Sequence, residues 1–310
     1  MMRPWEISQG IRGRRTSLPE SNPTPAGKKL AHPAVHAARV FADTAEIEEI
    51  RPLKETGIVN GVTTNPTLLK KAGADSWESA DRIMKEIVAY MAPDPVCLEL
   101  TEIEQGKMLE QAARLADFGD NVVIKVATGG YAKLEGGQER FTGINVIHEL
   151  WKRDIKTLAT LIFNSSQAFW AATAGATYIC PFLGRLADHL YKNDQPERPA
   201  GNALHYIEDH KIPAGGADRV DNTAYVAADG ARKDAGVRLI NEIMVIFNNY
   251  DIATEVLVAS FRNAAQVMEC LVAGADIVTV PADILTGVAD HPLSEAGMEA
   301  FVADTKVFDR

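Results

Sequence analysis

Short apolar runs alternate with longer amphipathic segments along most of the chain. The short runs are rich in β-branched residues, which is typical of buried strands, and the longer segments show the apolar spacing of helices. The predicted strands are Val40–Thr44, Gly61–Thr64, Val96–Leu100, Val122–Val126, Leu158–Phe163, Thr177–Phe182, Glu255–Ser260 and Asp276–Pro281. The clearest predicted helices are Asp75–Met91, Glu104–Ala116, Gly143–Lys152, Ser165–Ala174, Arg232–Asn248 and Asn263–Ala273.

This alternation predicts the fold class. Strands that alternate with helices form parallel sheets with right-handed crossovers. Eight such units predict an α/β protein with a (β/α)8 TIM barrel, a fold of about 250 residues. The alternative is a doubly wound open sheet, but no glycine-rich phosphate-binding turn follows the first strand. We therefore assign the barrel catalytic domain to residues 39–310, with a final amphipathic helix at Ser294–Thr305.

Two regions depart from the alternation. Residues 1–38 are rich in proline and lack the apolar core of a secretory signal, so we expect an N-terminal extension. Residues from about 190 to 231 are rich in proline and glycine and predict a loop insertion after the sixth strand, close to the mouth of the barrel. The sequence assigns no role to either region.

The amino-acid composition and net charge disfavour several classes of partner and a membrane-spanning protein. The chain is 46% hydrophobic and 24% charged, with a net charge of 32 − 42 = −10, which disfavours binding to nucleic acid or to an anionic membrane. No segment approaches the roughly 18 consecutive apolar residues of a membrane span. The cysteines Cys97, Cys180 and Cys270 follow no metal or redox spacing, so we expect free thiols and a cytoplasmic protein.

One lysine lies inside an apolar strand. Lys125 stands between Ile124 and Val126, which would face the surrounding helices. Because side chains alternate between the two faces of a barrel strand, Lys125 is predicted to face the interior. A fully buried lysine is rare unless it is paired or functional.

Other strands repeat the pattern at the same end. Asp43, Glu99 and the hydroxyl of Thr160 are each predicted to point inward near the carboxyl end of a strand, where active sites of this fold lie. The alternative is a structural ion-pair network of Lys125 with Asp43 or Glu99. Three strands that each contribute one ionisable group favour a catalytic set.

Such a set permits carbonyl chemistry. A desolvated lysine beside another charge can lose its proton near neutral pH and attack a carbonyl group. The resulting imine withdraws electrons, so that an adjacent C–C bond can break. The seven histidines show no paired ligand spacing, and we therefore expect no metal and no cofactor.

Two strand ends carry further polar residues. The segment Thr63–Thr67 predicts a helix start with Asn65 as its N-cap, and it leaves the Asn65 side chain at the barrel mouth. After the seventh strand, Ser260 and Arg262 form a predicted anion site with the next helix start, because barrels often bind phosphate there. A lone arginine at a helix start is otherwise a solvated residue.

Several motifs in order resemble the transaldolase family. They extend over about Val40–Lys306, apart from the insertion. The similar segments are Gly61–Leu69, Val123–Val126 with Thr128, Pro181–Arg185, Ala259–Asn263 and His291–Leu293.

The resemblance implies an activity and a role for each site residue. A transaldolase transfers a dihydroxyacetone unit from fructose 6-phosphate or sedoheptulose 7-phosphate to an aldose phosphate in the pentose phosphate pathway. The implied catalytic residues are Lys125 as the Schiff-base lysine, Asp43 as the acid/base, and Glu99 and Thr160 as the holders of a catalytic water. The implied substrate-binding residues are Thr63, Asn65, Cys180 and Phe182, with Arg185, Ser260 and Arg262 at the phosphate.

The resemblance also leaves alternatives. Glu99 and Phe182 stand where the fructose 6-phosphate aldolases of this family usually have glutamine and tyrosine, which favours transfer over simple cleavage. Cys180 stands where many transaldolases have a serine that touches substrate, and the insertion after Arg185 lies close to the predicted barrel mouth. These departures leave a sulfo-sugar or another sugar as an alternative substrate. A non-catalytic binding protein is the alternative from another class. The family resemblance further implies a homo-oligomer.

Overall fold

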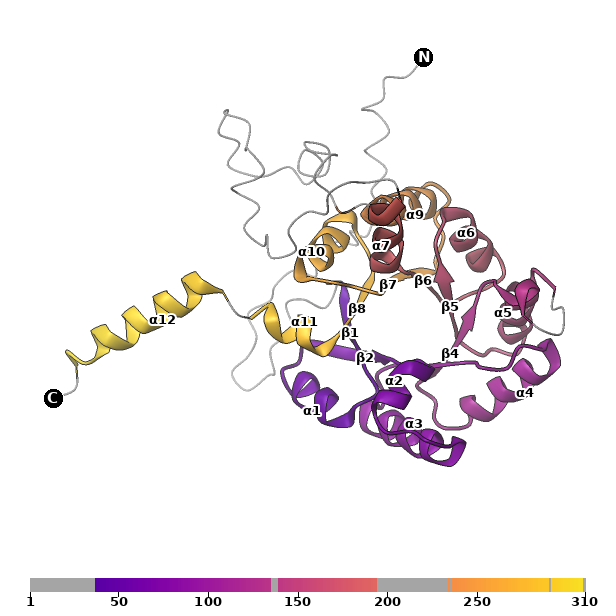
Figure 1. Ribbon diagram of the computed structural model, residues 1–310, viewed down its shortest axis with the longest axis horizontal. Coiled ribbons are helices and arrows are strands. Elements are labelled where there is room, and N and C mark those ends of the chain that lie inside the picture. The colour runs from indigo at the N-terminus through magenta and orange to yellow at the C-terminus, as the bar shows by residue number, and fades with distance from the viewer. Residues whose placement is uncertain (1–36, 135–138, 194–233, 235, 290, 309–310) are drawn as a thin grey trace, which may run out of the picture.

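The eight predicted strands all form, and they close into a parallel barrel in chain order from β1 to β8 (Figure 1). This confirms the predicted (β/α)8 barrel and excludes the open sheet. The computed structural model describes residues 37–134, 139–193, 234, 236–289 and 291–308. The strands are β1 Arg39–Asp43, β2 Val59–Thr63, β3 Val96–Glu99, β4 Val122–Ala127, β5 Thr157–Ile162, β6 Tyr178–Pro181, β7 Glu255–Val258 and β8 Ile277–Val280.

Helices surround the barrel, and most of them begin at side-chain caps. Asn65, Asn164 and Asn263 each accept a hydrogen bond from a backbone N–H three residues further on, which fixes the start of the helix that follows. The helices are α1 Ile47–Glu55, α2 Pro66–Lys71, α3 Trp77–Met91, α4 Gln105–Ala116, α5 Thr142–Lys152, α6 Ser165–Thr173, α7 Leu183–Asn193, α9 Val237–Asn249, α10 Ala264–Ala273, α11 Ala282–Gly287 and α12 Pro292–Thr305.

Three of these helices were not predicted from the sequence. Helix α1 contains Pro52, α11 has only six residues, and α7 runs into the region that was assigned to a loop insertion. The first residues of that region, 190–193, are therefore helical. Its remainder up to residue 231, and residues 1–36 of the predicted extension, lie outside the described part of the chain.

Two separate apolar layers build the core. One lies between the strands and the helices and contains Ile124 and Val126, while the other fills the barrel interior and contains Val123 and Leu158. Lys125 shares the inward direction of Val123, because residues two apart in a strand face the same side. The interior layer consists of Phe41, Cys97, Val123, Leu158, Tyr178, Cys180, Leu257, Ala259 and Ile277.

Helix α12 extends away from the barrel (Figure 1). It confirms the predicted C-terminal helix. Its apolar side chains Leu293, Met298 and Phe301 are exposed, the last to 67%. Among the described helices, none is both long enough and apolar enough to cross a bilayer.

Candidate active site

Lys125 and Glu99 form a buried ion pair at the carboxyl ends of β3 and β4. The strand register places the two residues directly opposite each other. Lys125 Nζ lies 3.0 Å from Glu99 Oε2 and donates a hydrogen bond of 3.1 Å to the carbonyl oxygen of Thr64. The Lys125 side chain is 3% exposed and that of Glu99 is 17% exposed. The amine is therefore held in one position and separated from bulk water.

Asp43 enters the same site from β1. Thr63 on β2 is its register partner, and Thr63 Oγ1 donates a hydrogen bond of 2.8 Å to Asp43 Oδ1. The Thr63 hydroxyl also lies 2.6 Å from that of Thr279 on β8. Three neighbouring strands thus orient one carboxyl group toward the barrel mouth.

The electrostatics differ from the expectation drawn from the sequence. Burial lowers the pKa of Lys125, but the negative charges of Glu99 and Asp43 outweigh it, so the pKa lies above the ordinary lysine value. Burial raises the pKa of Asp43, opposed by the charge of Lys125 and the hydrogen bond from Thr63. The expected proton loss from Lys125 near neutral pH was therefore wrong for the free site, because carboxylates surround the amine. Any nucleophilic attack requires a proton transfer first, and Glu99 lies within reach to accept that proton.

Thr160 and Cys180 line the interior beside the lysine. The Thr160 hydroxyl is buried and forms no hydrogen bond of ordinary geometry among the described residues, although it lies close enough to the Cys180 thiol to lower that thiol's pKa. Burial prevails and raises the pKa of Cys180 to about 12, so the thiol is neutral at physiological pH. Leu161, with φ at +57°, produces a register shift directly after Thr160. Bulges of this kind redirect side chains near active sites.

The mouth of the barrel presents an amide, an aromatic ring and two arginines. Asn65 accepts a 3.0 Å hydrogen bond from Leu68 N, so that one of its oxygen lone pairs is used in the helix cap. The Phe182 ring lies close to two cations: its centroid is 5.9 Å from Lys125 Nζ and 5.2 Å from the guanidinium carbon of Arg185.

The predicted phosphate residues lie together after β6 and β7, but some of their polar groups bind one another. Ser260, with φ at +72°, accepts a 3.2 Å hydrogen bond from Arg185 N. Arg262 binds one oxygen of Asp188 through Nε at 3.0 Å and Nη2 at 2.9 Å. Its Nη1 donates to the Ser260 carbonyl oxygen at 3.0 Å. Asp188 and the Ser260 turn therefore orient Arg262, and an anion must bind its remaining N–H groups.

Gly184 permits the close contact between the segments that follow β6 and β7. A Cβ at Gly184 would lie 1.9 Å from the carbonyl oxygen of Ser260. Only glycine permits this approach of the two loops, and the approach brings Arg185 next to the Ser260 turn.

Sequence reasoning missed four contributors to the site. Thr279 is a polar residue within the apolar run Ile277–Val280, and the alternation rule applied to Lys125 also identifies it. The other three are the Thr64 carbonyl, the ion-pair partner Asp188, and Gln111, whose side-chain oxygen accepts hydrogen bonds from the backbone after β3. They depend on tertiary contacts and have no local signal in the sequence. Among the described residues, no group of three or more His, Cys, Asp or Glu side chains has the geometry of a metal site.

Comparisons with known proteins agree with one another. Residues 40–309 match the model of the transaldolase/fructose-6-phosphate aldolase family. A probable transaldolase of Maridesulfovibrio salexigens is 36% identical over 264 residues, which are 85% of this chain and 96% of that protein. A probable transaldolase of Methanococcus maripaludis is 35% identical over 266 residues, 86% of this chain and 96% of that protein. One of Clostridium tetani is 33% identical over 272 residues, 88% of this chain and 100% of that protein.

Proposed function

The chain belongs to the transaldolase/fructose-6-phosphate aldolase family, and from this premise we propose that it is a transaldolase. It moves a dihydroxyacetone unit from a ketose phosphate to an aldose phosphate through a Schiff base on Lys125. The proposed setting is the pentose phosphate pathway in the cytoplasm. One observation supports the proposal most strongly: a buried amine lies 3.0 Å from a carboxylate at the catalytic end of the barrel.

The first step forms the imine. Glu99 accepts a proton from Lys125, and the freed electron pair of Nζ attacks C2 of the ketose. The C2 oxygen takes up one proton from Nζ and the proton that Glu99 accepted, and it leaves as water, so that a protonated C=N bond to Nζ remains. Thr160 and Glu99 hold this water in the proposed mechanism. Hydrolysis reverses the sequence and returns the electron pair to Nζ.

The second step breaks the C3–C4 bond. Asp43 accepts the proton of the C4 hydroxyl, the bonding electrons move to C3, and the protonated imine takes up the charge as an enamine. An aldehyde phosphate leaves. Addition of a second aldehyde follows the same path backwards, with Asp43 as the acid. The raised pKa of Asp43 suits both C–C cleavage and C–C addition. A carboxyl group that holds its proton more tightly is a better base in cleavage, and it keeps the proton that it donates in addition.

Arg262, Arg185 and Ser260 bind the substrate phosphate in this proposal. Arg262→Ala is therefore expected to raise KM for fructose 6-phosphate by about 10- to 100-fold, which corresponds to one lost charge-assisted hydrogen bond. Transfer from dihydroxyacetone to an aldehyde without a phosphate is expected to change little, because neither substrate then needs Arg262. Steady-state kinetics with both donors make this comparison.

Arg153→Ala is the matched control, because Arg153 is exposed after α5 and far in sequence from the two loops. An unchanged KM for fructose 6-phosphate in Arg262→Ala would remove this arginine from the phosphate site.

A homo-oligomer is part of the proposal. The exposed apolar side chains of α12 support it, since they pack on nothing among the described residues and exposed apolar surface of this kind is typical of interaction sites. The double substitution Leu293→Ser/Phe301→Ser is expected to reduce the mass in solution to that of a smaller assembly, measured by light scattering on a size-exclusion column. Glu295→Ser/Asp304→Ser changes polar positions of the same helix and is expected to leave the mass unchanged. Equal masses for the wild type and both variants would argue against α12 as the contact.

Product analysis distinguishes the candidate functions. With fructose 6-phosphate and erythrose 4-phosphate, a transaldolase releases glyceraldehyde 3-phosphate and sedoheptulose 7-phosphate. Without the acceptor, it stops after about one equivalent of aldehyde per active site. Continuous release of free dihydroxyacetone would instead identify an aldolase. Absence of any product with several ketoses would favour a binding protein.

A further inference from the structure

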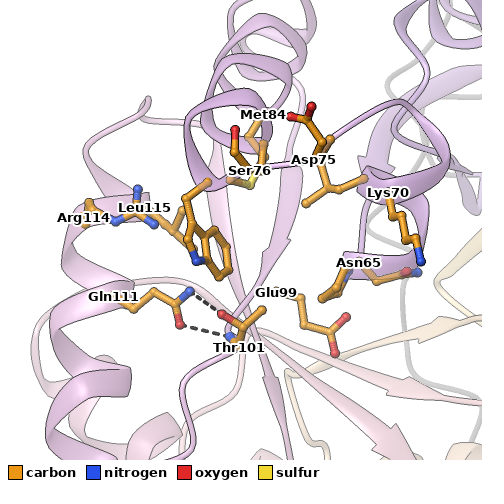
Figure 2. A pocket seen from close by; sticks show the side chains of 15 residues that line it. Asn65, Lys70, Asp75, Ser76, Met84, Glu99, Thr101, Gln111, Arg114 and Leu115 are labelled. Carbon is orange, nitrogen blue, oxygen red and sulfur yellow. Dashed lines mark hydrogen bonds between the residues drawn. The ribbon is translucent and has the colours of Figure 1, made fainter.

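A cavity of about 370 Å³ lies beside the catalytic ion pair, outside the strands. It is bounded by α2, α3, α4 and the end of β3. Figure 2 shows Glu99 at one end of the cavity, with Asn65 on one side, Thr101 and Gln111 on the other, and Asp75 and Ser76 at the far end. Of this lining, the proposed mechanism uses only Glu99, and the family resemblance implies a substrate contact for Asn65.

The cavity lies opposite the proposed phosphate site. Because the barrel closes in chain order, β3 is four strands away from β7, on the other side of the ring. A ketose that extends from Lys125 toward Arg262 therefore fills the β6–β7 side of the mouth. The β3 side, where Glu99 contacts the cavity, stays clear of the phosphorylated tail.

The cavity connects the surface to the catalytic carboxylate. Its outer residues Lys70, Asp75 and Arg114 are exposed, and Trp77 is 57% exposed. At the inner end, Glu99 contacts the cavity with a side chain that is 17% exposed, whereas its partner Lys125 is 3% exposed.

Polar groups lie along the inner part of this passage. Gln111 Oε1 accepts hydrogen bonds of 3.0 Å from Thr101 N and from Glu102 N, and Gln111 Nε2 donates to Thr101 Oγ1 at 2.9 Å. These bonds fix the loop that follows Glu99. A buried water needs two to four polar partners, and one water occupies about 30 Å³ in the liquid. The cavity has room for several waters and polar groups at its inner end to bind them.

We propose that this cavity is the path by which water reaches and leaves the imine on Lys125, while the sugar phosphate occupies the barrel mouth. The inference rests on the proposed function. Each imine formation releases one water at C2, and each hydrolysis consumes one. With the mouth filled by sugar, that water needs a second route, and Glu99, which accepts its proton, lies at the inner end of the cavity. The C–C steps exchange no water and do not depend on the route.

Chemical plugging of the cavity tests the proposal. The native cysteines Cys97, Cys180 and Cys270 are all buried, so a thiol introduced at the cavity wall is labelled selectively. Ala74→Cys places a thiol there, and N-benzylmaleimide adds to it as a thioether whose extent is measured by intact mass. Ala113→Cys, on the exposed face of α4 outside the lining, is labelled in the same way as the control. The unlabelled aliquot of each variant shows that the substitution itself is tolerated.

The measurement follows the C–C bond-forming step and the imine hydrolysis step in one enzyme sample. Enzyme is loaded with the dihydroxyacetone imine from fructose 6-phosphate while the released aldehyde is consumed, and excess donor is removed. The loaded enzyme then receives erythrose 4-phosphate, which converts the dihydroxyacetone adduct to the larger sugar phosphate adduct and fills the mouth before hydrolysis. Borohydride quenching at intervals and intact mass then give the rate of this conversion and the later decay of the sugar phosphate adduct to free enzyme.

We expect the label to slow imine hydrolysis and to leave C–C bond formation almost unchanged. In fully labelled Ala74→Cys, hydrolysis of the sugar phosphate adduct slows by about tenfold or more, while conversion of the dihydroxyacetone adduct to the sugar phosphate adduct stays within about twofold of the unlabelled aliquot. Labelled Ala113→Cys shows neither change. Unchanged hydrolysis in fully labelled Ala74→Cys would overturn the proposal, and so would an equal slowing of both steps. Failure of every unlabelled protein to form an adduct would overturn the proposed function and the inference with it.

Discussion

Replacing Lys125 with methionine is expected to lower kcat/KM by about 10⁴-fold or more and to abolish borohydride trapping of a ketose. Methionine has nearly the length of lysine and suits the apolar interior beside Val123 and Leu158, but it has no nucleophilic nitrogen. Circular dichroism and thermal unfolding are expected to show a folded protein. The Glu99 carboxylate loses its cation but keeps contact with the cavity.

Lys107→Met is the matched control for this substitution. Lys107 is exposed on α4, and its replacement is expected to leave both trapping and turnover unchanged. A Lys125→Met/Glu99→Gln double variant shows whether any loss of stability comes from the unpaired carboxylate. Trapping that persists in the folded Lys125→Met protein would mean that another lysine forms the imine.

Asp43→Asn is expected to separate the two halves of the reaction. Loss of the acid/base should lower the rate of C3–C4 cleavage by about 10²- to 10⁴-fold. Imine formation uses Lys125, Glu99 and Thr160 but not Asp43, so borohydride should still trap fructose 6-phosphate intact on the enzyme. Asparagine can keep the hydrogen bond from Thr63, because its side-chain oxygen also accepts. The measurement is the mass of the trapped adduct, six carbons in the variant and three in the wild type after the aldehyde has left.

The same substitution should not reduce stability. Burial raises the pKa of Asp43, so the folded protein binds this proton more tightly than the unfolded chain. The stability that depends on Asp43 is therefore fully present below the ordinary carboxyl pKa and is lost as the pH rises through the raised value. At any pH where this carboxyl group is ionised, its burial is a cost, and Asp43→Asn removes that cost. The free energy of unfolding is expected to be equal to or higher than that of the wild type.

Asp120→Asn, at an exposed carboxylate before β4, is the control and should change neither rate nor adduct. If Asp43→Asn instead loses trapping and cleavage together, Asp43 acts in imine formation or in the positioning of Lys125, and its role at the C3–C4 bond is wrong.

Strand periodicity predicted more of the site than any single motif did. Lys125 and Glu99 interrupt apolar strands, and the alternation of side chains was sufficient to predict their inward direction. Their 3.0 Å contact depends on the register of β3 and β4, which periodicity alone does not specify.

Features that depend on distant contacts could not be predicted in this way. The electrostatics of Lys125 follow from two carboxylates on other strands, so the sequence suggested a lowered pKa where the structure raises it. No local pattern predicted an ion pair for Arg262, but Asp188, 74 residues away in the chain, binds its guanidinium group. The cavity beside Glu99 arises from the packing of three helices, none of which has a pattern that distinguishes it from an ordinary barrel helix.

Mapping the trapped adduct is the most direct test of the central claim, that Lys125 forms the imine. The wild-type protein is reduced with borohydride in the presence of fructose 6-phosphate and digested with trypsin. Because trypsin does not cleave after an alkylated lysine, the account predicts a single modified peptide of residues 115–133, uncleaved at Lys125 and heavier by the reduced sugar fragment. An unmodified peptide of residues 115–125 together with a sugar adduct on a different lysine would contradict it.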